Sequence, residues 1–407
     1  MKNLKSLIMS AILLIIIGLN VNAQNEIQEI KTRPFQLSFV TPLGTNGLES
    51  MNITNNFSFN IFAGFNGGLN GIEFSGFAGI LKNNMNGAQF AGFSNIVLGK
   101  SRGVQFSGFS NINTGSFYGL QAAGFANIIT NDAIGGQLAG FANVTTNMID
   151  GIQIAGFANY SQGNKKGQIS GFANTNIGDL NGVQIAGFGN VNTKKVDGIQ
   201  IAGFANISGK VNGAQIAGFA NVTKKLNGVQ IGVFNFVDSL ESGIPIGVFS
   251  FVKNGYRTFE ISCSETLYGI ASFKTGTKQF YNIISVGVGY KKDKLHWGWG
   301  YGIGTLKTLK NNWDLAFELI SFHINEDEWF TDEINLNNKF QITTSKEIAE
   351  NLNVFAGLSW NVNVSKIEDH HGNEFESTIA PWTVFDKNYD NDVNIKMYPG
   401  FTAGIRF

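Results

Sequence analysis

The sequence is poor in cysteine, in net charge and in long apolar runs, and each shortage excludes a class of protein. Its single cysteine, Cys263, rules out an intrachain disulfide and a thiolate metal cluster. Lys plus Arg and Asp plus Glu each number 29, so the net charge gives no reason to bind nucleic acid. After the first 23 residues no segment is apolar enough for a transmembrane helix, so any later entry into a membrane has to use a β-barrel.

The N-terminus has the pattern of a secretory signal peptide. Lys2 and Lys5 precede an apolar run over residues 7–19, and Ala23 ends a small-residue cleavage site before Gln24. The apolar run is shorter than the roughly 18–20 residues that a membrane-spanning helix needs. No cysteine follows the cleavage site, so we do not expect a lipoprotein anchor. Residues 1–23 are therefore left out of the fold prediction, and we expect an exported protein.

One short phrase, NGVQIAGFANV in its commonest form, is repeated through the first two thirds of the chain. Successive copies are 15 or 16 residues apart, which is the signature of a repeat architecture. One copy alone buries too few apolar side chains to offset the entropy of ordering its backbone, so the copies have to stack on one another. The phenylalanines that mark the copies are Phe77, Phe93, Phe109, Phe125, Phe141, Phe157, Phe172, Phe188, Phe204, Phe219, Phe234 and Phe249.

Two all-β architectures fit this period. In a β-solenoid each copy is one coil, with Phe stacked on Phe and Asn on Asn; in a wide antiparallel β-barrel each copy is one membrane strand. All linkers are alike, whereas a barrel alternates short and long connections. The linkers also keep an apolar residue that a solenoid corner can direct into its core, namely Met85, Ile149, Leu180, Val196, Val211 and Leu226. The pattern favours the solenoid, and the wide barrel remains the alternative.

The repeated NGVQIAGF phrase resembles the tandem surface-repeat proteins of bacterial envelopes. The resemblance covers residues 57–252 and twelve copies. It implies a location at the cell envelope and says little about activity.

Beyond residue 256 the repeat stops and the pattern becomes strands of period two. In LNVFAGLSWNVNV one face carries Leu358 and Trp360 with five more apolar residues, while Ser359 and Asn361 lie on the other face. Apolar side chains outside and polar or small ones inside are typical of a lipid-embedded barrel. The last strand, YPGFTAGIRF, resembles the C-terminal strand of Gram-negative outer-membrane barrels. We expect strands near 258–263, 267–274, 280–290, 295–306, 313–324, 336–344, 351–364 and 398–407.

Two further segments, 34–44 and 243–252, are candidate barrel strands, and they bring the expected total to ten. On that count the repeats would leave the barrel after its first strand and lie outside the cell. If residues 56–65 form a barrel strand as well, the repeats face the periplasm instead. The expected organisation is a signal peptide over 1–23, an N-terminal segment over 24–56 with the first barrel strand, repeats over 57–252 and a barrel-like region over 253–407.

The sequence offers little catalytic chemistry. The histidine cluster of Glu368, Asp369, His370, His371 and Glu374 lies in a long polar connection and is better explained as a solvated loop than as a metal site. Glu318 and Asp314 are expected to point inward and to pair with a cation such as Lys339. No phosphate loop, nucleophile elbow or zinc motif is present in the sequence. We therefore expect no catalytic residue, no cofactor and no metal.

The expected function is that of a non-enzymatic outer-membrane or cell-surface protein with a structural or adhesive role. Its partners would be outer-membrane lipid and surface glycans or proteins, and not nucleic acid. The hypothesis gives the stack an exposed ladder of glutamines for weak, repeated contacts: Gln184, Gln200, Gln215 and Gln230. The alternative is an outer-membrane pore or transporter for small polar solutes, which is favoured if the repeats are barrel strands.

Overall fold

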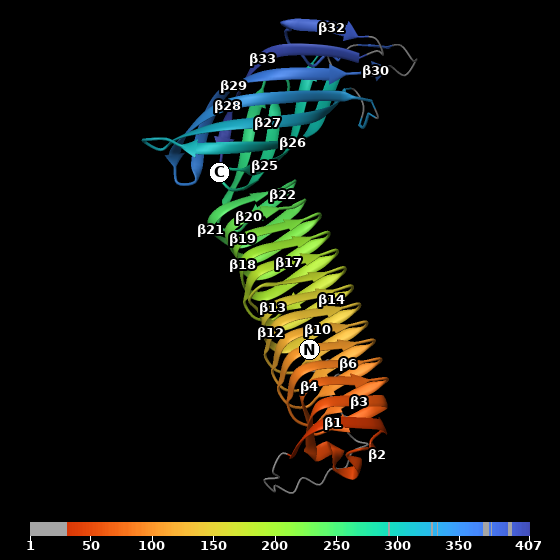
Figure 1. Ribbon diagram of the computed structural model, residues 1–407. Helices are drawn as coiled ribbons and strands as arrows, with labels where there is room; N and C mark the ends of the chain where they lie inside the picture. The colour runs from red at the N-terminus through yellow and green to blue at the C-terminus, as the bar shows by residue number, and fades with distance from the viewer. Residues whose placement is uncertain are drawn as a thin grey trace.

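The computed structural model describes residues 31–291, 294–326, 329–331, 333–368, 374–375, 377–389 and 393–407. In these ranges the chain consists almost entirely of β-strands, arranged as a long rod that joins a second, antiparallel sheet (Figure 1). The expected signal peptide over 1–23 and three members of the histidine cluster, Asp369, His370 and His371, lie outside the described residues.

The rod is a parallel β-solenoid. Its sheet has 22 strands, and successive coils pair in parallel so that each residue lies beside its own copy: in the pairing of β18 with β19, Gln200 faces Gln215 and Asn190 faces Asn206. The solenoid prediction is therefore confirmed, and the wide antiparallel barrel is wrong. The elements are β1 (Lys31–Val40), β2 (Leu43–Gly44), η1 (Gly47–Asn52), β3 (Ile53–Asn66), β4 (Gly68–Ser75), β5 (Ala78–Leu81), β6 (Met85–Ala91), β7 (Ser94–Val97), β8 (Ser101–Ser107), β9 (Ser110–Asn113), β10 (Phe117–Ala123), β11 (Ala126–Ile129), β12 (Ala133–Ala139), β13 (Ala142–Ala155), β14 (Ala158–Asn164), β15 (Gly167–Ser170), β16 (Ala173–Asn176), β17 (Leu180–Ala186), β18 (Gly189–Ala202), β19 (Ala205–Ala217), β20 (Ala220–Ile231), β21 (Phe234–Ile246) and β22 (Phe249–Val252).

Residues 34–44 and 243–252, which were predicted to be barrel strands on either side of the repeats, belong to the solenoid instead. β1 pairs in parallel with β3, with Phe35 beside Phe57, and β22 pairs in parallel with β21, with Phe249 beside Phe234. The ten-strand count is therefore wrong. The reason is physical: a strand at the end of a parallel stack has the same two-sided pattern as a barrel strand, and only its partner distinguishes them.

The antiparallel sheet has nine strands in the order β23-β24-β25-β26-β27-β28-β29-β33-β32, and β23 also pairs with β33 through five residues from Glu260 to Ser264. All eight strands predicted between 258 and 407 are present, and β32 is an addition. They are β23 (Tyr256–Ser264), β24 (Gly269–Gly276), β25 (Tyr281–Lys291), β26 (Lys294–Thr308), β27 (Trp313–Glu326), β28 (Asn335–Ala349), β29 (Leu352–Ser365), β32 (Phe385–Tyr389) and β33 (Val393–Arg406), with a separate hairpin of β30 (Ile367–Glu368) and β31 (Glu374–Phe375).

The sheet has a short-turn end and a long-connection end. Residues 277–280, 309–312 and 350–351 make the short turns, and the last residue, Phe407, lies at the same end because β23 and β33 are antiparallel and Phe259 bonds Phe407. The opposite end carries the connections over 265–268, 292–293, 327–334 and 366–392, and so both of the long ones. The solenoid enters at residue 256, which is at the short-turn end.

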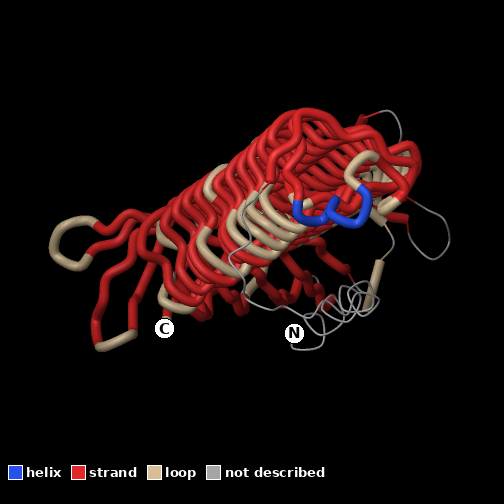
Figure 2. Tube along the Cα trace, turned by 60° about the horizontal axis from the view of Figure 1, so that its bottom comes forward, coloured by secondary structure: helices blue, strands red, loops and turns tan. Residues whose placement is uncertain are grey.

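The last coil of the solenoid packs against β24 and β25 (Figure 1). The side chain of Asn282 donates to the Gly247 carbonyl at 2.8 Å and accepts from the Ser250 amide at 2.9 Å. Thr275 donates to the Ser250 carbonyl at 3.1 Å, and Arg257 lies over the Phe251 ring. At the other end of the rod, η1 covers the first coils, and the Ser50 hydroxyl donates to Asn66 at 2.9 Å. Figure 2 shows the stack obliquely from this end, with η1 in blue.

Candidate functional site

The interior of the solenoid is built around two ladders of buried amides. In the first, each Gln Nε2 donates to the Gln Oε1 of the preceding coil at 2.7–3.1 Å. In the second, each Asn Nδ2 donates to the Asn Oδ1 of the following coil at 2.8–3.0 Å. The ladders run through Gln89, Gln105, Gln121, Gln137, Gln153, Gln168, Gln184, Gln200, Gln215 and Gln230, and through Asn95, Asn111, Asn127, Asn143, Asn159, Asn174, Asn190, Asn206, Asn221 and Asn235.

The two ladders point in opposite directions along the rod, so their amide dipoles oppose each other. The glutamine ladder donates toward the N-terminus and ends on Glu73, which accepts from Gln89 at 2.9 Å. A carboxylate suits this position because it accepts hydrogen bonds and has none to donate when ionised. The asparagine ladder donates toward the C-terminus and ends on the Ser250 hydroxyl. At their acceptor ends, Gln230 Oε1 and Asn95 Oδ1 have no hydrogen-bond partner.

Glu73 is completely buried, and this burial raises its pKa above the ordinary 4.5 despite hydrogen bonds from Gln89 and Asn66 that favour the ionised form. It is the one acidic residue described inside the stack between residues 57 and 252. The ladder therefore ends in a group whose charge depends on pH.

The buried glutamines overturn the proposed exposed ladder. Gln184, Gln200, Gln215 and Gln230 are all 0% exposed, while their neighbours in the same strands point outward. The sequence hypothesis assumed that the apolar side chains of the phrase face the core. In a parallel stack, however, every buried amide meets its own copy and is satisfied, so this core can be polar. Apolar residues do fill the part of the core next to the linkers, as predicted; they are Leu180, Val196, Val211, Leu226, Val237 and Val252.

The outer surface of the solenoid is correspondingly apolar. In a typical coil Ile199, Ile201, Phe204 and Ile207 point outward and are 40, 37, 42 and 46% exposed. Phenylalanines at the corner of each coil stack face to face, 4.7–5.0 Å apart and within 9° of parallel, along ten coils. We call this corner the Phe edge: Phe77, Phe93, Phe109, Phe125, Phe141, Phe157, Phe172, Phe188, Phe204 and Phe219.

Beside the Phe edge lies an open groove of about 910 Å³ that follows the rod over seven coils. Its wall is a column of large apolar side chains that includes Phe74, Phe90, Phe106, Leu138 and Ile154, and its floor is made of Gly, Ala and Ser. The glycines of the floor are required by the stack: a Cβ on Gly140 would collide with the Gly124 carbonyl oxygen, and the same holds for Gly124 against Gly108.

Charged residues are confined to the opposite edge. Between residues 78 and 252 the chain has ten basic and six acidic residues, and each lies six to eleven positions before the next phenylalanine of the repeat. These positions form the linkers, which we call the linker edge; Lys195, Asp197 and Lys210 are examples. Wherever a coil of this range carries charge, the charge lies at the linker edge and the aromatic rings lie at the other edge.

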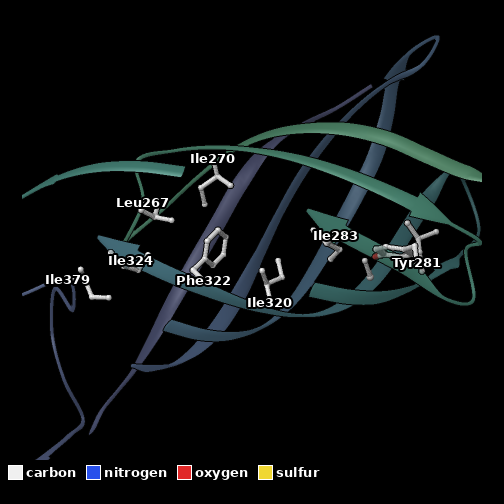
Figure 3. Close-up of a cluster of buried hydrophobic side chains, with 10 residues drawn as sticks. Leu267, Ile270, Tyr281, Ile283, Ile320, Phe322, Ile324 and Ile379 are labelled. Carbon is white, nitrogen blue, oxygen red and sulfur yellow. The ribbon is translucent and has the colours of Figure 1, made fainter. Parts of the chain in front are cut away.

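The antiparallel sheet also exposes large apolar side chains, while its buried side mixes polar, charged and apolar residues. Leu358, Trp360 and Val354 point outward and are exposed, as the sequence predicted, whereas Asn361 and Ser359 are buried. Figure 3 shows an apolar cluster on the inner side that includes Ile270, Ile283, Ile320 and Phe322. The strand alternation predicted from the sequence is thus confirmed.

A buried ion network lies next to this cluster. Lys274, which is 0% exposed, donates to Glu260 at 2.5 Å and to Glu318 at 2.6 Å, and Arg406 donates to Glu260 at 2.7 Å. Glu318 is inward as predicted, but its cation is Lys274 rather than Lys339. A cavity between Glu260, Lys339 and Gln341 measures only about 10 Å³, which is room for no more than one water molecule.

The described residues contain no group of three or more His, Cys, Asp or Glu side chains placed to hold a metal ion. Cys263 is exposed on β23. Within the described ranges there is no helix whose length and apolar character would let it cross a membrane. No family model, no curated protein and no solved structure matches this chain. The geometric feature that bears on function is the apolar exterior of both sheets.

Proposed function

We propose that this protein is a non-enzymatic component of a bacterial outer membrane, anchored by its antiparallel sheet, which closes into a small β-barrel. The observation that carries the proposal is the reversed distribution of side chains: large apolar residues point outward, while charged residues lie inside. Leu358 is 75% exposed, whereas Lys274 and Glu318 are almost completely buried. Such an exterior is stable in lipid and costly in water. The pairing of β23 with β33 supports closure, because it joins the first strand of the sheet to the last long one.

The filled interior supports an anchor rather than a pore. The ion network, the apolar cluster and Tyr281 occupy the space between the strands. A barrel of about eight strands is wide enough only for its own side chains. The alternative function of a pore for polar solutes was favoured by antiparallel repeats, and the repeats are parallel.

The direction of the solenoid follows from the loop lengths. Outer-membrane barrels place short turns in the periplasm and long connections outside. The solenoid joins the sheet at the short-turn end, so the repeats of this protein face the periplasm. This proposal departs from the cell-surface location expected from the ten-strand count, which included two strands that belong to the solenoid.

Epitope tags in cells that express the full chain test the anchor and its direction. We expect a tag after Phe330, in a long connection, to bind antibody on intact cells. Tags after Lys310, in a short turn, and after Asn131, in a repeat linker, should bind only after the outer membrane is opened. Equal labelling of the Phe330 and Asn131 tags on intact cells would contradict the periplasmic direction, and recovery of the chain in the soluble fraction would contradict the anchor.

Conductance tests the filled interior. The purified full chain in planar bilayers is expected to give no discrete current steps. Regular steps at physiological salt would show an open lumen and would revive the pore hypothesis.

A further inference from the structure

We propose that the solenoid does not project from the membrane but lies in the membrane plane, with its Phe edge immersed in the acyl chains of the leaflet on the short-turn side. This inference rests on the proposed barrel anchor. It assigns one partner, bilayer lipid, to the apolar surface that runs along the rod.

The first argument is the size of the apolar surface and its lack of charged residues. The stack is roughly 50 Å long, since parallel strands lie ~4.8 Å apart, and outside the linker edge it exposes apolar side chains with no charged residue among those described. Soluble proteins seldom leave apolar patches larger than a few hundred Å² in contact with water. A surface of this kind that covers both flanks of the Phe edge requires an apolar partner that covers both flanks as well.

The second argument is depth. From Ile199 to the corner at Phe204 the coil advances five residues, which is at most about 16 Å at ~3.3 Å per residue, because β18 ends at Ala202. One leaflet contributes about half of the ~30 Å hydrocarbon core. The apolar part of each coil therefore matches one leaflet, and the linker edge is left at the level of the headgroups. The linker edge carries ten basic and six acidic residues, and this surplus of positive charge suits an anionic headgroup layer.

The third argument is the way the last coil is joined to the sheet. Lys274 and Tyr281 point inward, so their neighbours Thr275 and Asn282 belong to the outer face, and both are buried by the solenoid. The rod is thus attached to the side of the sheet that would meet lipid.

The contacts also fix which edge points into the bilayer. At the linker edge Gly255 lies against Gly276, the last residue before a short turn. Near the Phe edge Gly247 contacts Asn282, which in turn contacts the Tyr301 hydroxyl at 2.9 Å, farther from the turn. Gly276 pairs with Tyr281, and Asn282 is the next residue, so the contact near the Phe edge lies one residue farther from the short-turn end than the contact at the linker edge. In Figure 1 the long axis of the rod runs across the long strands β26–β29 and β33, which is the arrangement that a rod in the membrane plane requires.

Single-cysteine variants of the full chain test the inference, because the protein has only Cys263. The native chain reports on the outer face of β23. C263S/F141C reports on the Phe edge, and C263S/N131C is the matched control at the linker edge of the neighbouring coil. Each is labelled with an environment-sensitive NBD fluorophore and refolded into phosphatidylcholine–phosphatidylglycerol vesicles with or without doxyl-labelled lipid. C263S/L138C, on the wall of the groove, provides a second apolar site in case F141C fails to fold.

We expect blue-shifted emission and at least twofold quenching by doxyl lipid at Cys263, F141C and L138C, and neither effect at N131C. Unquenched, water-like emission at F141C and L138C with a quenched Cys263 would overturn the in-plane solenoid and leave the anchor intact. Blue-shifted emission without lipid quenching at those two sites would also overturn it, because another protein surface would then cover the Phe edge. An unquenched Cys263 would refute the anchor itself.

Discussion

The glutamine ladder makes a quantitative prediction about stability, in which one substitution has different effects at two equally buried positions. Gln137 donates to Gln121 at 3.1 Å and accepts from Gln153 at 2.8 Å and from Thr145 at 2.9 Å. Gln230 makes one ladder bond, to Gln215 at 2.7 Å, and its own oxygen has no partner. The two side chains are 1 and 0% exposed.

Replacement of either glutamine by leucine keeps the side-chain volume nearly unchanged and removes the side-chain hydrogen bonds. Q137L removes three hydrogen bonds and leaves buried partners unsatisfied on both neighbouring coils, at about 1–3 kcal/mol for each orphaned group. Some of these partners retain a second bond, as Gln153 does to the Tyr160 carbonyl. We therefore expect Q137L to lower the free energy of unfolding by about 3–6 kcal/mol. Q230L orphans one acceptor and should cost about 1–3 kcal/mol.

Urea unfolding in detergent micelles, followed by far-UV circular dichroism, measures both values. Hydrogen exchange read by mass spectrometry then localises the loss, since neighbouring coils of a solenoid can open separately. All six tryptophans lie beyond residue 256, so their fluorescence reports on the antiparallel sheet and serves as an internal control. An equal decrease in the free energy of unfolding for Q137L and Q230L would refute the reasoning, because the decrease would then depend on burial and not on the number of ladder hydrogen bonds.

Three further predictions follow from the core and the stack. Because burial raises the pKa of Glu73, the free energy of unfolding should fall as the pH rises from about 4.5 toward the pKa of Glu73 in the folded state. Denaturant titrations between pH 4 and 8 measure this decrease, and E73Q should abolish it. The same dependence of unfolding free energy on pH in E73Q would contradict the prediction. G140A places a methyl group against the Gly124 carbonyl and should prevent stacking of the coils. In G136A the new methyl group meets only the flexible end of Leu120 at 2.9 Å, so this variant should fold. The far-UV circular dichroism spectrum and the protease resistance of the two variants test this difference, and a well-folded G140A would contradict the stated coil spacing. K274M leaves Glu260 and Glu318 with Arg406 as their remaining cation and should cost up to about 3–5 kcal/mol. K210M at an exposed linker pair should change stability little. Similar unfolding midpoints for the two variants would show that the network is solvated.

Much of the fold could be predicted from residue spacing alone. A period of 15 or 16 residues with uniform linkers leaves few alternatives to a stack of coils, because no single copy can bury enough surface to fold. The strict alternation in β29, with Trp360 on one face and Asn361 on the other, likewise fixed the strands of the C-terminal sheet and their outward side. Both patterns are properties of one segment of the chain, so they can be recognised without knowing which strands pair with that segment.

The sequence did not determine which face of the repeat is the core. Ile199, Gln200 and Ile201 alternate in either case, and whether Gln200 is inside depends on Gln184 and Gln215 lying directly beside it to complete its hydrogen bonds. The same holds for the ends: Phe35 and Phe249 belong to the solenoid because of the strands next to them. Period and alternation are properties of one segment, whereas burial of a polar group is decided by contacts between segments, and only the tertiary structure supplies these.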